Sequence, residues 1–245
     1  MGRLAAAQAA RYLQAAVSRH GTARVIFAAA PSQDEFLEAL RQDKGVTWSK
    51  VVAFQLDEYS GLPSHAPQRF GRYLDRQLFH HVDLKEVHYL DPGGLSPEEV
   101  CRRYEALLGD GPLHLACIGI GENGHIAFND PHVADFRDPF KVKPVELDEV
   151  CRQQQVNDGC FSSLAEVPHQ AVTMTISAIT SAEAIICVVP GERKRQAVAR
   201  TLQGPISPAC PASILRTHPG ATLFLDGASG QGLEVGESMK GALHV

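Results

Sequence analysis

A histidine and an acid follow a glycine-rich stretch near the middle of the chain. Residues 119–131 read GIGENGHIAFNDP and contain His125 and Asp130. They follow an apolar run at residues 114–118 that is typical of a buried strand. Three glycines within six residues let the backbone turn tightly and approach a ligand closely. An imidazole and a carboxylate on such a turn are suited to proton transfer, and a tight turn around a buried histidine explains the stretch equally well.

Two adjacent acids, Asp57 and Glu58, follow another apolar run at residues 51–56. Neighbouring side chains on a strand point to opposite faces, so at most one of the two acids is expected to face a shared pocket. Solvated acids at a strand end would be the commoner situation for this pair taken alone.

Two more loops carry groups that bind anions. Ser32 and Glu35 have the spacing of a capping box, which predicts a helix N-terminus with free N–H groups for a phosphate, although an ordinary cap is the simpler interpretation. Residues 190–195, PGERKR, place Lys194 among three cations in a first helical turn, where the helix dipole disfavours them. A bound anion accounts for that placement, as does a solvated cluster balanced by Glu192.

Strands and helices alternate along the chain. Apolar runs predict strands at residues 23–30, 51–56, 114–120, 172–176, 184–189 and 222–225, and helical patterns fall at 33–42, 70–82, 97–108 and 193–202. Ser96 and Pro97 open the third of these helices. The alternation predicts a single Rossmann-like α/β domain over residues 1–245, with a mostly parallel central sheet and helices on both faces.

Segment 131–168 is polar, rich in charge and without a clear period, and it is called the lid segment below. We expect it to be an irregular, lid-like insertion over the sheet edge. Ligands of open parallel sheets bind beyond the carboxyl ends of the strands, where the four loops described above should meet. Together they predict a site for proton transfer on a small phosphorylated substrate.

Composition narrows the class of protein. The chain has 245 residues, 44% of them hydrophobic, and a formal net charge of −5, which argues against a general nucleic-acid binder. Its six cysteines form no C-x-x-C pair, so no zinc motif or dense disulfide framework is indicated and a reducing cytoplasm is the expected location. The alanine-rich N-terminus is expected to be an amphipathic helix, and no apolar stretch is long enough to span a membrane.

The segments LDEYSGLP at 56–63 and GIGENGHIAFNDP at 119–131 resemble glucosamine-6-phosphate deaminases, in the superfamily that also holds the 6-phosphogluconolactonases. The similarity extends over about residues 23–226. It implies a Rossmann-like fold and conversion of glucosamine 6-phosphate and water into fructose 6-phosphate and ammonia, with no metal or organic cofactor. The expected partner is a small-molecule sugar phosphate, with no nucleic acid and no membrane, and a homo-oligomer is compatible with the family.

The resemblance also implies roles for single residues. Asp57 matches the base that takes the C2 proton, His125 the ring-opening histidine, and Asp130 the acid that supports this histidine. Lys194 matches the phosphate-binding lysine, and Ser32 lies in the equivalent of the phosphate loop. Further substrate contacts are expected from Glu58, Gly124 and, in the lid segment, Arg152, which could replace an arginine that helps to hold phosphate.

Three departures from the family pattern stand out. Asn123 replaces an aspartate and Asp130 a glutamate, and the phosphate loop reads AAAPSQ instead of a glycine- and threonine-containing sequence. Two alternatives to a deaminase therefore stay open: a 6-phosphogluconolactonase-type hydrolase and a non-catalytic sugar-phosphate binder. The residues after Gly124 and His125 favour a deaminase over a lactonase, and retention of Asp57 and His125 favours an enzyme.

Overall fold

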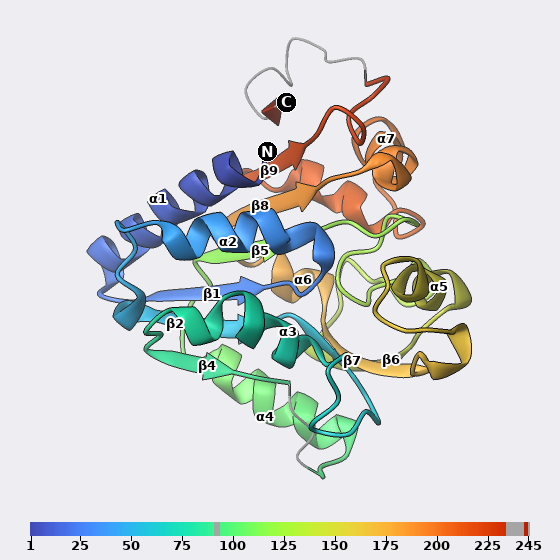
Figure 1. Ribbon diagram of the computed structural model, residues 1–245, viewed down its shortest axis with the longest axis horizontal. Coiled ribbons are helices and arrows are strands. Elements are labelled where there is room, and N and C mark those ends of the chain that lie inside the picture. Colours follow the sequence, from blue (N-terminus) through green and yellow to red (C-terminus); the bar gives the residue numbers. More distant parts are fainter. Residues whose placement is uncertain (91–93, 234–242, 245) are drawn as a thin grey trace.

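The computed structural model describes residues 1–90, 94–233 and 243–244 (Figure 1). Its centre is a seven-stranded sheet in the order β10-β9-β8-β5-β1-β2-β4, and every neighbouring pair is parallel. This confirms the α/β class predicted from the alternation. The strands are β1 (Ala23–Phe27), β2 (Val51–Gln55), β4 (Glu86–His88), β5 (Leu115–Ile118), β8 (Ala184–Val189), β9 (Ala221–Leu225) and β10 (Leu243–His244).

Helices cover both faces of this sheet, as expected. On one face lie α1 (Gly2–His20), α2 (Asp34–Gln42) and α3 (Phe70–Gln77), and on the other lie α4 (Pro97–Gly109), α6 (Ile176–Ile179) and α7 (Arg195–Gln203). Alternate residues of β1 feed the two cores, since Val25 and Phe27 pack with the first group and Ile26 with the second. Each such side chain stabilises the fold by roughly 1.5–3 kcal/mol.

The lid segment is more ordered than its sequence suggests. It contains β6 (Val142–Glu146) and α5 (Glu149–Asn157), and β6 pairs with β7 (Gln170–Met174) and then β3 (Asp57–Tyr59) in a separate antiparallel sheet. The expectation of an irregular insertion is therefore wrong, and the strand expected at 172–176 does not join the parallel sheet. Pairing with β7 makes β6 a strand in spite of its polar residues and Pro144.

Of the two capping boxes predicted from the sequence, one forms and the other does not. Ser96 caps α4, because its side chain accepts a hydrogen bond from the Glu99 amide at 3.3 Å. The box predicted at Ser32 does not form: a 3-10 turn over Pro31–Gln33 precedes α2, and the side chain of its N-cap residue, Gln33, does not cap the helix. The Glu35 carboxylate instead accepts from the amide of Gly2 at 2.9 Å. Within the described residues, no helix is long and apolar enough to cross a membrane.

The order of the strands brings the functional loops together. Strands β8, β5, β1 and β2 are consecutive neighbours, so the loops that follow their carboxyl ends meet at one edge. Beside them the chain changes sheets: β2 ends at Gln55, and β3 begins at Asp57 in the antiparallel sheet. This places Asp57 where the two sheets meet.

Candidate active site

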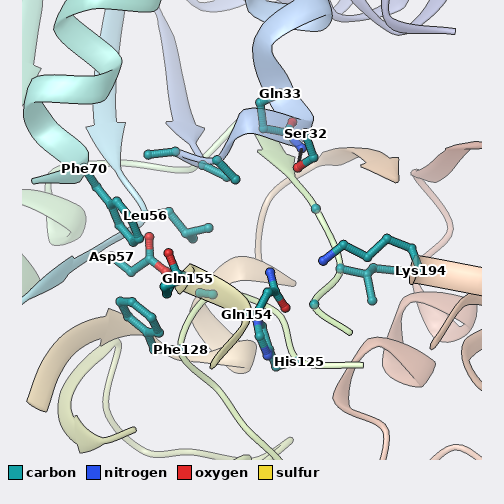
Figure 2. Close-up of a pocket in the computed structure, with 17 residues that line it drawn as sticks. Ser32, Gln33, Leu56, Asp57, Phe70, His125, Phe128, Gln154, Gln155 and Lys194 are labelled. Carbon is teal, nitrogen blue, oxygen red and sulfur yellow. Dashed lines mark hydrogen bonds between the residues drawn. The ribbon is translucent and has the colours of Figure 1, made fainter. Parts of the chain in front are cut away.

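A cavity lies beyond the carboxyl ends of the central strands (Figure 2). All four loops selected from the sequence contribute to it, and helix α5 of the lid segment closes one side. Its lining includes Ala28–Ala30, Ser32, Gln33, Leu56, Asp57, Phe70, Gly119–Gly121, His125, Ala127, Phe128, Gln154, Gln155 and Lys194. The sheet edge therefore brings Asp57, His125 and Lys194 together in one place.

His125 is held by two neighbours on its own loop. Its Nδ1 lies 2.8 Å from Asn123 Oδ1 and 3.0 Å from Asp130 Oδ1. Both partners are acceptors when Asp130 is ionised, so Nδ1 carries the proton and the Nε2 of the neutral ring can exchange a proton in the cavity. Asn123 also donates to Asp130 Oδ1 at 2.8 Å, which closes a three-residue ring of contacts.

Asp130 is suited to stay ionised in this ring. Burial raises the pKa of this fully buried carboxyl, but hydrogen bonds from His125 and Asn123 outweigh it and bring the pKa below the usual value. Cys151 of helix α5 lies against the same group, and Asp130 raises the pKa of this buried thiol in addition to the larger effect of burial. Asp130 is thus a permanent acceptor for His125.

Gly121 makes room for the histidine. A Cβ atom at this position would lie 2.1 Å from His125 Cε1, and the Gly121 amide donates to the His125 carbonyl at 2.9 Å. The ring therefore lies directly over a backbone that only glycine can provide. The loop needs glycine at position 121 because the imidazole of His125 lies so close to the backbone there.

Asp57 faces the other end of the cavity with a buried carboxyl group. It is 6% exposed, and burial, followed by the charge of Glu58, raises the pKa of its carboxyl well above the usual value. A desolvated carboxylate of this kind binds protons more strongly than one in water. An aromatic cluster of Tyr59, Phe70 and Phe128 packs beside it, with ring centroids 4.8–5.6 Å apart.

Lys194 enters the cavity from the side opposite Asp57 (Figure 2). Its side chain is buried, and burial lowers the pKa of its ammonium group. The two neighbouring arginines form ion pairs with acids: Arg193 with Glu122 and Asp158, and Arg195 with Glu192. Ser32 also lines the cavity, where its hydroxyl accepts a hydrogen bond from Gln33 at 3.2 Å.

Three residues that were expected to contact the substrate are not among those that line the cavity. Glu58 points behind the wall and accepts hydrogen bonds from the amides of Phe70 and Gly71. Arg152 donates to the carbonyls of Leu164 and Val167, which satisfies its guanidinium inside the lid segment. Gly124 has φ +91° and packs against Cys210 behind the loop, so its role is conformational.

Sequence reasoning missed several residues that line the cavity. Gln154 and Gln155 reach it from α5, Gln33 from the loop after β1, and the aromatic wall comes from Phe70 and Phe128. Gln154 also joins the lid to the glycine-rich loop, since its Oε1 accepts from the Glu122 amide at 2.9 Å. The run of three glutamines at 153–155 was the available signal, but it indicates a pocket only when the helix is known.

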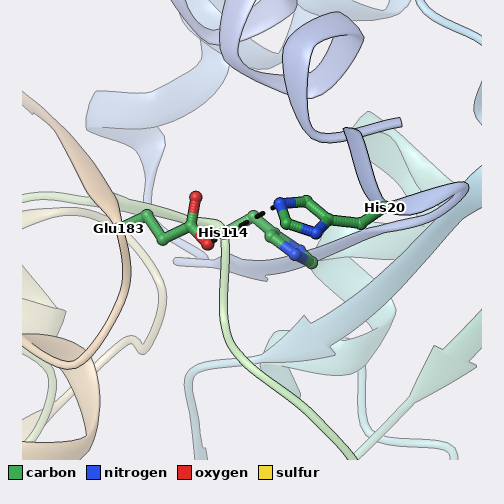
Figure 3. A group of neighbouring side chains, drawn as sticks. All are labelled: His20, His114 and Glu183. Carbon is green, nitrogen blue, oxygen red and sulfur yellow. Dashed lines mark ion pairs between the residues drawn. The ribbon is translucent and has the colours of Figure 1, made fainter. Parts of the chain in front are cut away.

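Two groups of described residues bring potential metal ligands together. One is His125, Asp130 and Cys151, in which Asp130 already binds its two neighbours. The other is His20, His114 and Glu183, shown in Figure 3, near the amino ends of β5 and β8. His114 Nδ1 accepts from the Arg24 amide at 2.9 Å, so Nε2 of the neutral ring carries the proton and offers no lone pair. Neither group is a good donor set for a metal.

The fold and the cavity together define a Rossmann-like α/β enzyme with acid–base groups at the carboxyl edge of its sheet. Residues 1–224 match the family described as glucosamine-6-phosphate isomerases/6-phosphogluconolactonase. The chain belongs to this family, which confirms the resemblance seen in its two motifs.

Relatives of known name agree with this assignment. A glucosamine-6-phosphate deaminase of Shouchella clausii (strain KSM-K16) is 39% identical over 196 residues, which are 78% of this chain and 76% of the relative. One of Bacillus thuringiensis (strain Al Hakam) is 40% identical over 180 residues, 73% of this chain and 66% of the relative.

Solved structures give the same picture. A monomeric glucosamine-6-phosphate deaminase matches with a TM-score of 0.84 and 29% identity over 94% of this chain and 96% of its own. A 6-phosphogluconolactonase from Thermotoga maritima has a TM-score of 0.73 and 19% identity over 91% of this chain and 94% of its own, so it shares the fold.

Proposed function

We propose that the protein is an isomerising deaminase that converts glucosamine 6-phosphate and water into fructose 6-phosphate and ammonia. One observation carries this proposal: a buried carboxylate, Asp57, and an oriented imidazole, His125, face the same cavity as a lysine, Lys194. The names of the relatives supply the substrate, and the cavity supplies groups of the right chemistry for it.

His125 would open the sugar ring. Because its Nδ1 is held by Asn123 and Asp130, Nε2 can carry a proton between the ring oxygen and the C1 hydroxyl. Ionised Asp130 stabilises the imidazolium that forms in between, in the way that a carboxylate supports a catalytic histidine. The product of this step is the open-chain aldehyde.

Asp57 would then move a proton from C2 to C1. The C2–H bond breaks, a C1–H bond forms, and a proton passes from the amine to O1, which turns the aldehyde into a hydroxymethyl group and the amine into a C2 imine. Water adds to the imine, its oxygen becomes the C2 carbonyl, and ammonia leaves. A base with a raised pKa suits the removal of a weakly acidic carbon-bound proton.

Lys194 and Ser32 would hold the phosphate, at the end of the cavity away from Asp57 (Figure 2). The amide of Gln155 lines the same cavity and makes no side-chain hydrogen bond within the described residues, so it can bind a sugar hydroxyl. All six cysteines are free thiols, and this supports a reducing, cytoplasmic location.

The test is ammonia release from glucosamine 6-phosphate by the purified protein, coupled to detection of fructose 6-phosphate. We expect both products in equal amounts, and Asp57→Asn should abolish them while leaving the thermal unfolding midpoint within a few degrees of wild type. A protein that releases no ammonia from any hexosamine 6-phosphate, yet is stabilised against heat by a sugar phosphate, would be a binder. Hydrolysis of 6-phosphogluconolactone without ammonia release would make it a lactonase.

A further inference from the structure

Glu58 is a buried acid that the mechanism above leaves without a task. It is 1% exposed and lies next to the base in the chain. Its carboxylate accepts from five donors, namely the amides of Tyr59 (2.9 Å), Phe70 (3.1 Å) and Gly71 (3.1 Å), Gln55 Nε2 (2.9 Å) and Arg69 Nε (3.5 Å). So many donors around one buried carboxylate fix its position and stabilise a negative charge there.

These donors come from β2, β3 and the start of α3, which adjoin Asp57 at the change of sheets. Leu56 is hydrogen-bonded to both sheets, since its amide donates to the carbonyl of Phe27 in the central sheet and its carbonyl accepts from the amide of Met174 in β7. Gln55 Nε2 binds the Asp57 carbonyl at 2.9 Å as well as the Glu58 carboxylate. Glu58 thus ties β2, β3 and the start of α3 to one point beside the base.

We propose that Glu58 is a positioning residue: it fixes Asp57 at the junction of the two sheets, and its buried negative charge makes Asp57 a stronger base. The inference rests on the proposed function. Like charges that share a region of low polarity disfavour each other's ionisation. After burial, Glu58 is the group that raises the pKa of Asp57, which agrees with this geometry.

The other ionisable groups around Asp57 leave Glu58 as the fixed negative charge next to it. Burial raises the pKa values of the thiol and the two phenols nearby, so they are neutral near pH 7. His125 and Lys194 face the same cavity, and Arg69 pairs with the Glu58 carboxylate at 3.5 Å. The ionisable groups around Asp57 are therefore Glu58 and Tyr59 on β3, Tyr104 on α4, Cys151 on α5, His125 on the glycine-rich loop, Lys194 before α7 and Arg69 before α3.

The experiment compares the pH dependence of kcat/KM for ammonia release in wild type and three variants. Glu58→Gln removes the charge, so Asp57 should ionise more easily and the acid limb should move down by about one pH unit. Glu58→Asp keeps the charge on a shorter side chain, so kcat should fall without movement of the limb. Glu105→Gln is the matched control, because Glu105 also accepts from two backbone amides, at Lys141 and Val142, but does not perturb Asp57.

A folded Glu58→Gln enzyme with lower kcat and an unmoved acid limb would overturn the proposal, since a purely structural role predicts that result. If Glu58→Gln does not fold, NMR titration of isotope-labelled aspartate and glutamate carboxyls in wild type decides the matter, with Asp57→Asn and Glu58→Asp for assignment. An Asp57 midpoint well above about 3.9 with Glu58 still ionised at that pH supports the proposal, and an ordinary Asp57 midpoint or a Glu58 that is protonated there refutes it. A wild-type protein without ammonia release would refute the proposed function alone, because this titration needs no activity.

Discussion

Replacement of Gly121 by alanine is the sharpest test of how the glycine-rich loop works. The new Cβ would lie 2.1, 2.2 and 2.4 Å from His125 Cε1, Nε2 and Nδ1. Non-bonded carbon atoms lie about 3.5–4.0 Å apart, so the imidazole must move by roughly 1.5 Å. A shift of that size breaks the bonds of 2.8 Å and 3.0 Å from Nδ1 to Asn123 and Asp130.

We expect Gly121→Ala to lower kcat/KM for ammonia release by a hundredfold or more, since a misplacement of about 1 Å can cost that much. The matched control is Gly109→Ala at the end of α4, where a Cβ would meet nothing within 4 Å. The control should keep the wild-type rate, and the thermal unfolding midpoint should show that both variants are folded.

A double variant separates displacement of the histidine from general damage to the loop. If Gly121 acts only through His125, then Gly121→Ala combined with His125→Ala should be no slower than His125→Ala alone. Wild-type activity in Gly121→Ala would refute the reasoning, because a displaced imidazole could not then matter. Fully additive losses would also refute it, since they would mean that the alanine harms the site by another route.

Two more substitutions test the groups on either side of the histidine. Asn123→Asp would bring two carboxyl oxygens together where a 2.8 Å N–H···O bond now joins residue 123 to Asp130, so the two carboxyl groups must share one proton. The kcat/KM of this variant should follow that of wild type at low pH and fall at higher pH, where the shared proton is lost. An unchanged pH profile would contradict the geometry. Lys194→Met should raise KM for glucosamine 6-phosphate about 10- to 150-fold with a smaller effect on kcat, from the loss of a charged hydrogen bond worth ~1.5–3 kcal/mol. In wild type, burial lowers the pKa of Lys194, so KM should begin to rise at a lower pH than the one at which an exposed lysine loses its proton. If Lys194→Met has the same KM as wild type, Lys194 does not contact the phosphate.

The parallel sheet and its loops were predictable because their signals are local. Apolar runs such as residues 184–189 become buried strands in any α/β fold, and parallel order then sends the loops after them to one edge. This rule alone brought Asp57, His125 and Lys194 together before any contact was known, and all three line the cavity.

The antiparallel sheet was not predictable, because β6 is a strand through its pairing with β7 and not through its own residues. Residues 142–146 carry Lys143 and Pro144 and have no apolar run, yet they pair with β7 along their whole length. The same limit applies to Arg152, whose guanidinium could have faced a phosphate but is used by carbonyls of its own segment. Strand alternation allowed one of Asp57 and Glu58 to face the cavity, and only the change of sheets decided which.

The position of Arg152 changes how the altered phosphate loop should be understood. Among the described residues that line the cavity, Lys194 is the one lysine or arginine, and the nearby polar groups are neutral: Ser32, Gln33 and Gln154. A dianionic phosphate there would rest on one ammonium and on uncharged donors, so a single substitution should expose most of the electrostatic recognition. For this reason Lys194→Met tests the phosphate site more directly than any change in the AAAPSQ loop, where each residue contributes a neutral contact or none.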